Sequence, residues 1–231
     1  MMSDYLTLTR AAAIAAPILF SMLAFYLVSS GALRKVWLRH AIFFVRIATA
    51  AVFIAVAFSE KSRSYLSFSF PEENYSWLLT ALLSAAANRL ACKAAAKKSV
   101  QKNYPQLRMG VWSNSLMAIN LLTWLIYLFG YELFFRGYLL HTAAGFMSIP
   151  MAVGLNLFFY SIAHSLKGWK EIAGSIPFGL LVCVLSIATG NIWSAFIIHA
   201  SMALSVEWFT AKRLQRTLLS NAYSAKSYEN A

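Results

Sequence analysis

The chain has 231 residues, of which 60% are hydrophobic and only 12% are charged. An ordinary soluble domain carries about 25% charged residues, so this composition, with a mean hydropathy of +0.61, predicts a polytopic helical membrane protein. The net charge of +12 does not indicate a nucleic-acid partner, because the basic residues flank several apolar runs instead of forming one patch.

The apolar runs predict the architecture. We expect an all-α protein, a polytopic helical membrane bundle of about seven to eight transmembrane helices. The first run, at 11–32, is too long for the apolar part of a signal peptide, so it is interpreted as a retained span. Residues 109–120 either lie along the inner interface or extend the span that follows. The spans are expected near residues 11–32, 41–58, 75–92, 122–144, 149–166, 172–189 and 192–210.

The positive charges predict the orientation of the chain in the membrane. They gather in the loop at 33–40, in the loop at 93–108 and in the C-terminal tail, the pattern typical of cytoplasmic segments. We therefore expect an integral protein of the bacterial cytoplasmic membrane, with the N-terminus outside and the C-terminus inside. The residues concerned are Arg34, Lys35, Arg39, Lys93, Lys97, Lys98, Lys102, Arg108, Lys212, Arg213 and Arg216, with Arg89 at the end of the span before the second loop.

Glu132 is the only acidic residue between Glu73 and Glu171, and it lies in an apolar run four residues before Arg136. An ionisable side chain at membrane depth costs roughly 2.5–3.5 kcal/mol on insertion scales, and such residues usually face the bundle interior at a working site. The spacing of four places both side chains on one helix face as an ion pair. The alternative to a functional site is an ion pair that only holds this helix against its neighbours.

Two histidines, His164 and His199, lie in later apolar runs. Taken singly, each is more often a hydrogen-bonded core residue than a catalyst. Taken together with Glu132 and Arg136, they predict one buried polar centre, because each would otherwise need its own buried partner. The carboxylate and imidazole atoms are expected within about 8 Å of one another, a distance that one water molecule can bridge.

The run Tyr131-Glu132-Leu133-Phe134-Phe135-Arg136 resembles the EExxxR motif of the CAAX protease and bacteriocin-processing family, also called CPBP or Abi. Its members are glutamic-type intramembrane proteases related to the type II CAAX prenyl proteases. The segment from Tyr160 to His164 resembles the family's FxxxH motif, and the segment from His199 to Ala203 resembles its HxxxN motif. The resemblance covers roughly residues 117–210.

The resemblance implies an intramembrane endopeptidase. Glu132 together with His164 would hold and deprotonate a water molecule, Arg136 would orient Glu132, and His199 would donate to the oxyanion. The implied partners are the lipid bilayer and a membrane-embedded or lipidated peptide or protein substrate, with no cofactor and no metal. One membrane domain is expected, with N-terminal transmembrane helices at 1–110, a CPBP-like catalytic core at 111–211 and a basic cytoplasmic tail at 212–231.

Two positions depart from the family pattern. Tyr131 stands where the family has its first glutamate, and a phenol with an ordinary pKa of about 10 cannot replace that base at neutral pH. Ala203 stands where the family has the asparagine that assists the oxyanion. Glu207 is the nearest polar replacement, although it lies about 80° around the helix from His199. We expect Tyr131, Tyr160, Ala203 and Glu207 to contribute to substrate binding, with Tyr131 facing the bundle interior.

Three other interpretations stay open. The departures at Tyr131 and Ala203 favour a catalytically inactive CPBP-type protein that acts in immunity or partner binding, or an acyltransferase on the same scaffold. One glutamate and two histidines also match the ligands of catalytic zinc sites. The chain lacks HExxH spacing, however, and the resemblance implies a metal-free site.

Overall fold

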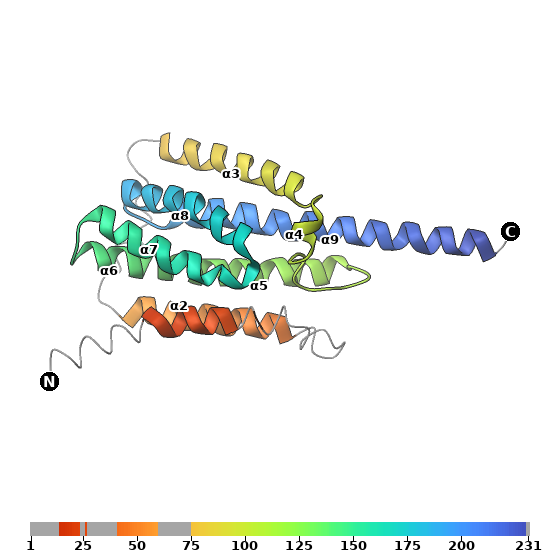
Figure 1. Ribbon diagram of the computed structural model, residues 1–231, viewed down its shortest axis with the longest axis horizontal. Helices are drawn as coiled ribbons and strands as arrows, with labels where there is room; N and C mark the ends of the chain where they lie inside the picture. Colours follow the sequence, from red (N-terminus) through yellow and green to blue (C-terminus); the bar gives the residue numbers. More distant parts are fainter. Residues whose placement is uncertain (1–13, 24–25, 27–40, 60–74, 230–231) are drawn as a thin grey trace.

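The computed structural model describes residues 14–23, 26, 41–59 and 75–229, and in these ranges every regular element is helical (Figure 1). Three of the described helical segments are long and apolar enough to cross a membrane, namely Ala41–Phe58, Asn114–Ala144 and Trp169–Thr189. The prediction of an all-α membrane bundle is therefore confirmed. The predicted span at 11–32 lies partly outside the described residues. The predicted loop at 33–40, with the basic residues Arg34, Lys35 and Arg39, lies wholly outside them.

Most helices run along the long axis of the molecule, and α9 projects beyond the bundle at the C-terminal end (Figure 1). Helix α3 packs along α9, α2 packs along α5, and α7 pairs with α8. A short helix at Ile14–Leu23 precedes the labelled elements. These are α2 (Ala41–Ser59), α3 (Tyr75–Ala94), α4 (Lys98–Gln101), α5 (Asn114–Glu132), the π-helix η4 (Leu133–Leu139), α6 (Leu140–Ala144), α7 (Ile149–Ala163), the 3₁₀ turn η5 (Ser165–Lys167), α8 (Trp169–Thr189) and α9 (Trp193–Glu229).

The helix that carries Glu132 begins at a defined cap. Ser113 has an extended backbone, and its hydroxyl accepts a hydrogen bond from the Leu116 amide at 3.2 Å, so it satisfies one of the free donors of the first turn. From Asn114 the chain continues through α5, η4 and α6 without a break to Ala144. Of the two arrangements considered for 109–120, the structure therefore shows the extension of the span, starting at Asn114.

Helices α2 and α5 approach closely at Gly130. A Cβ atom at this position would lie 2.9 Å from the Ala50 carbonyl oxygen and 3.1 Å from the Ala50 Cα, so only glycine allows this separation of the two backbones. The close approach lets Phe53 of α2 pack against the Tyr131 ring, at 5.5 Å between centroids, and against Phe134, at 5.1 Å. The residues on either side of Glu132 are thereby fixed in the bundle core.

Candidate active site between α5, α7 and α9

Glu132 ends α5 in a fully buried position, and its two carboxylate oxygens have different partners. Oε1 lies 2.5 Å from Nδ1 of His199 on α9, and Oε2 lies 3.3 Å from Nε of Arg136. The Arg136 guanidinium is also fully buried and lies over the Tyr160 ring, 4.2 Å from its centroid. The structure thus brings together the carboxylate, the guanidinium and one of the two imidazoles.

Arg136 lies in the π-helix η4, four residues after Glu132 at the end of α5. Side chains four apart lie on one helix face, and π-helical segments are frequent at functional sites. Asn156 of α7 donates from Nδ2 to the Phe135 carbonyl oxygen at 2.5 Å, and its Oδ1 accepts from Cys183 Sγ at 3.3 Å. The sequence interpretation missed Asn156, although a buried amide in an apolar helix was an available signal.

Hydrogen bonding assigns the same tautomer to both imidazoles in their neutral forms. His164 Nδ1 lies 2.9 Å from the Tyr160 carbonyl oxygen, which can only accept, so Nδ1 carries the proton. His199 Nδ1 faces a carboxylate oxygen of Glu132, and the same reasoning applies. In both rings Nε2 is therefore left as a hydrogen-bond acceptor, able to take a proton from a bound molecule.

Both histidines line a cavity of about 280 Å³. Of the other candidates, Tyr131, Tyr160 and Ala203 also line it, whereas Glu132, Arg136 and Glu207 are not part of its wall. Among the described residues, Glu132 has no hydrogen bond to His164. A molecule in the cavity therefore meets the imidazoles first, with the Glu132 carboxylate behind His199.

Tyr131 lies against both imidazoles from inside the bundle. Its ring centroid is 6.4 Å from that of His164 and 5.8 Å from that of His199, with both pairs close to perpendicular. Tyr160 completes the group, with its centroid 4.6 Å from the His164 ring and 6.4 Å from the His199 ring. The first position of the motif thus presents a phenol to the part of the cavity that contains the histidines.

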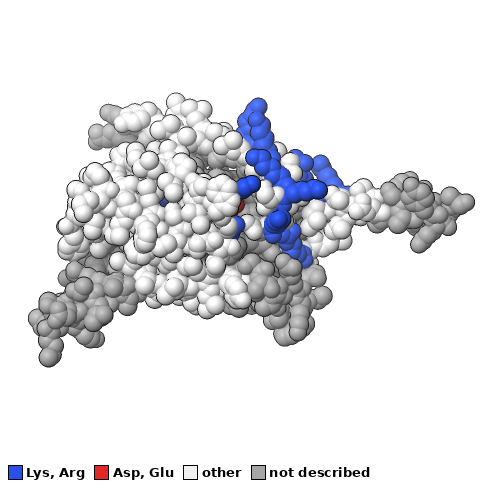
Figure 2. Space-filling model, in the orientation of Figure 1, with Lys and Arg blue, Asp and Glu red and all other residues white. Residues whose placement is uncertain are grey.

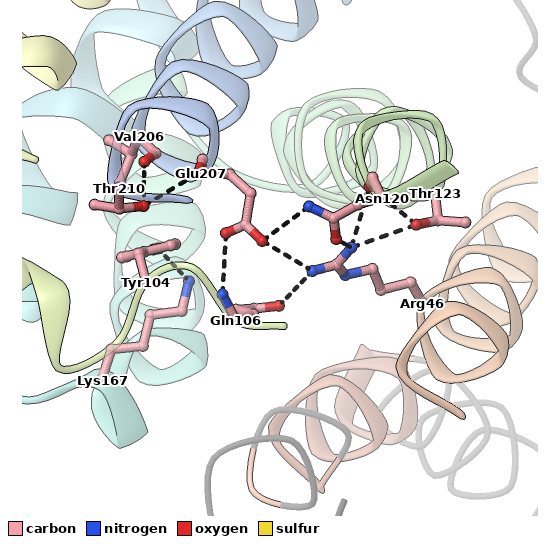
Figure 3. A network of polar contacts seen from close by, with 9 residues as sticks. All are labelled: Arg46, Tyr104, Gln106, Asn120, Thr123, Lys167, Val206, Glu207 and Thr210. Carbon is pink, nitrogen blue, oxygen red and sulfur yellow. Dashed lines mark hydrogen bonds and ion pairs between the residues drawn. The ribbon is translucent and has the colours of Figure 1, made fainter. Parts of the chain in front are cut away.

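A second buried polar cluster, shown in Figure 3, contains Glu207. Arg46 of α2 donates from Nη1 to Asn120 Oδ1 at 2.8 Å and from Nη2 to Gln106 Oε1 at 3.1 Å, and its Nη2 lies 3.8 Å from Glu207 Oε1. Glu207 also accepts from Asn120 Nδ2 at 3.0 Å and from the Gln106 amide at 3.1 Å. Glu207 is thus placed away from His199, in a group of which Arg46 and Asn120 were not predicted.

The cavity wall also contains the basic residues Lys167 and Lys170 near the start of α8. Lys167 Nζ donates to the Tyr104 hydroxyl at 3.4 Å, and burial lowers the pKa of its ammonium below the ordinary value. Figure 2 shows lysine and arginine side chains gathered in one band across the bundle, near where α9 emerges, while most of this face is uncharged. The polar end of the cavity therefore contains Lys167 and Lys170 together with Glu171.

The segment that matches a known protein family contains the residues of this site. Residues 113–205 match the family model described as Rce1-like, type II CAAX prenyl endopeptidase, a segment that includes Glu132, Arg136, both histidines and Ala203. The family resemblance expected from the motifs is thereby confirmed, and with the apolar helices it identifies an integral membrane protein. No curated protein and no solved structure matches the chain. In the described part of the chain, no group of three or more His, Cys, Asp or Glu side chains is placed to hold a metal ion.

Proposed function

We propose that this Rce1-like membrane protein is an intramembrane endopeptidase that cleaves a membrane-associated peptide or protein with a water molecule activated by His199. The observation that carries the proposal is the bond between His199 Nδ1 and Glu132 Oε1, at 2.5 Å, beside a cavity that His164 also lines. A carboxylate on Nδ1 fixes the tautomer and stabilises the imidazolium that forms when Nε2 takes a proton.

The proposed reaction has two steps. His199 Nε2 takes a proton from water while the water oxygen attacks the scissile carbonyl carbon, and His164 Nε2 accepts a hydrogen bond from the same water. The tetrahedral intermediate then collapses, the C–N bond breaks, and the imidazolium of His199 returns its proton to the leaving amine. In this scheme Glu132 acts through His199 and does not contact the water, since it is not part of the cavity wall.

Arg136 has a positioning role in this scheme. A carboxylate that is fully buried without a cation would be strongly disfavoured in its charged form, and the guanidinium, 3.3 Å from Glu132 Oε2, supplies the compensating charge. Stacking on Tyr160 fixes the guanidinium between α5 and α7. Tyr160 and Ala203 form part of the surface on which the substrate would lie.

The band of basic side chains in Figure 2 supports the expected orientation, with the C-terminus and the loop at 93–108 on the cytoplasmic side of a bacterial membrane. The substrate is then a membrane-embedded or lipidated peptide whose cleavage site reaches the cavity from that side. The motif-bearing residues all fall within the proposed core at 111–211.

A non-catalytic role in immunity or partner binding is the second candidate. The specific observation in its favour is the Tyr131 ring, which lies beside both imidazoles where the motif would otherwise place a carboxylate. An acyltransferase would use the same His199 and Glu132 but pass the acyl group to an acceptor other than water. The non-catalytic protein would give no cleavage product, and the acyltransferase would give a product whose acyl group is attached to an acceptor other than water.

The proposal is tested by comparing peptide termini in membranes from cells that produce the wild-type protein or the His199→Gln variant. We expect new termini in membrane proteins with the wild type and their absence with the variant. His141→Gln serves as a control, because His141 lies in α6 and does not line the cavity, so its termini should match the wild type. Identical termini in the wild type and the His199→Gln variant would contradict the proposal.

A further inference from the structure

Asn156 is a fully buried amide in the middle of the apolar helix α7, and it is not part of the cavity wall. Its Nδ2 donates to the Phe135 carbonyl oxygen of η4 at 2.5 Å, and its Oδ1 accepts from Cys183 Sγ of α8 at 3.3 Å. A buried amide costs free energy unless it is hydrogen-bonded, and here both its nitrogen and its oxygen are bonded. Asn156 thus joins η4, α7 and α8 at one point.

Helix α7 contacts two successive residues of η4. Asn156 bonds the carbonyl of Phe135, and Tyr160 lies beneath the guanidinium of Arg136, which is 4.2 Å from its ring centroid. Asn156 and Tyr160 are four residues apart and therefore share one face of α7. His164 follows one turn later, where its Nδ1 donates to the Tyr160 carbonyl and its ring lines the cavity. The amide and the stacked ring together fix how α7 is turned against η4.

Helix α8 holds the same face of α7 from the other side. A Cβ atom at Gly179 would lie 3.1 Å from Tyr160 Cδ1, so the α8 backbone passes directly against this ring. Cys183, one turn after Gly179, reaches Asn156. Two contacts one turn apart define both the rotation of α7 and its position along the axis of α8.

We propose that Asn156 is a positioning residue for the base His199. This inference rests on the proposed function and adds a residue that acts through others without contacting the reacting atoms. The Asn156 bond holds the backbone of η4 at Phe135, the residue directly before Arg136. The guanidinium is thereby held 3.3 Å from Glu132 Oε2, which leaves Oε1 directed at His199 Nδ1. Without the amide, η4 can move, and the carboxylate that fixes the imidazole moves with it.

The backbone of η4 does not need the amide for its own hydrogen bonding. The Phe135 carbonyl oxygen also accepts from the Leu140 amide, so it keeps a partner when the side chain at 156 cannot donate. The thiol of Cys183 is only a weak donor. An apolar side chain of similar size at 156 is therefore expected to preserve the helices and to change only how η4 is held.

The first measurement uses the full chain in liposomes with a membrane peptide that the wild type cleaves. Asn156→Leu should lower kcat by about 10–10²-fold while KM changes by less than about threefold, because a small misplacement of catalytic groups acts on the transition state. Met117→Ala is the matched control, since it truncates a buried side chain of α5 outside the cavity wall, roughly 22 Å along the helix from Glu132. It should lower thermal stability and keep the wild-type kcat.

The second measurement follows the His199 bond by proton NMR and needs no cleavage. In the wild type, the Nδ1 proton that His199 shares with Glu132 should give a low-field resonance, assigned by its absence from His199→Gln. In Asn156→Leu this resonance should move upfield or be lost, because the bond to the carboxylate lengthens. Met117→Ala should keep it at the wild-type position.

An unchanged His199 resonance in folded Asn156→Leu overturns the inference whatever the activity, and so does its absence from the wild type. A wild-type kcat, or a loss confined to KM, contradicts it as well. If no peptide is cleaved but the resonance moves, the proposed function fails while the control of the Glu132–His199 bond by Asn156 stands. Failure of both Asn156→Leu and Asn156→Ala to fold, while Met117→Ala folds, would make Asn156 a purely structural residue and would end the positioning role.

Discussion

Glu132 and His199 are 67 residues apart in sequence, yet Oε1 and Nδ1 lie 2.5 Å from each other inside the bundle. The bond joins the end of α5 to the middle of the apolar part of α9 and leaves His199 Nε2 as an acceptor beside the cavity. Because the histidine base is paired with the Glu132 carboxylate, it needs no further carboxylate at position 131. The loss of the first motif glutamate is therefore compatible with hydrolysis.

Glu132→Gln tests the role of the carboxylate. Glutamine has nearly the same shape and can still accept from His199 Nδ1, but it cannot stabilise the imidazolium by charge. We expect the cleavage rate to fall by roughly 10²–10⁴-fold, the usual contribution of general acid–base catalysis, measured with a membrane peptide that the wild type cleaves. Unchanged activity in a folded Glu132→Gln protein would remove Glu132 from the mechanism.

Arg136→Met tests the ion pair. The substitution leaves the Glu132 carboxylate buried without its cation, and breaking such a pair typically costs roughly 3–5 kcal/mol. Unfolding of the purified protein in detergent should show this loss. The double variant Glu132→Gln with Arg136→Met removes both charges and should be more stable than Arg136→Met alone. If Arg136→Met unfolds at the wild-type temperature, the pair does not contribute to stability.

Gly130→Ala tests the contact between α2 and α5. The added Cβ would lie 2.9 Å from the Ala50 carbonyl oxygen, so the two helices must separate, and overpacking of this kind costs typically about 1–3 kcal/mol. Gly154→Ala in α7 is the matched control, because its Cβ would meet nothing within 4 Å and alanine favours the helix by roughly 0.8–1.0 kcal/mol. Equal thermal stability of the two variants would show that the close approach is unimportant.

Arg46→Met tests the second cluster. Arg46 holds Gln106 and pairs with Glu207, so its loss leaves a buried carboxylate and releases the segment around Gln106. We expect lower thermal stability and faster limited proteolysis within residues 102–113. Arg89→Met, at an exposed position on α3, should stay within about 0.5 kcal/mol of the wild type. Similar proteolysis of the two variants would argue against a stabilising role for this cluster.

Much of the fold could be predicted from the sequence, because apolar runs of membrane length leave the backbone few alternatives to helices. The pairing of Glu132 with Arg136 followed from a spacing of four, which is local to one helix. Glu207 was expected to contribute to substrate binding, but it lies in the cluster with Arg46 and Asn120 and is not part of the cavity wall.

The remaining features depend on which helix faces meet. The resemblance implied that Glu132 acts together with His164, whereas the structure bonds Glu132 to His199, because depth along a helix does not fix its rotation. Arg46 and Glu207 meet across elements far apart in sequence, and no periodicity connects them. Asn156 of α7 donates to the Phe135 carbonyl oxygen of the π-helix from another helix. These contacts between helices could be identified only in the packed structure.

The most direct test of hydrolysis at this site is cleavage of a membrane peptide in H₂¹⁸O, followed by mass spectrometry of the new C-terminus. Activation of water by His199 predicts one ¹⁸O atom in the new carboxyl group with the wild-type protein and no cleavage with His199→Gln. A product whose acyl group is attached to another acceptor, a new C-terminus without ¹⁸O, or cleavage that persists in His199→Gln would contradict the account.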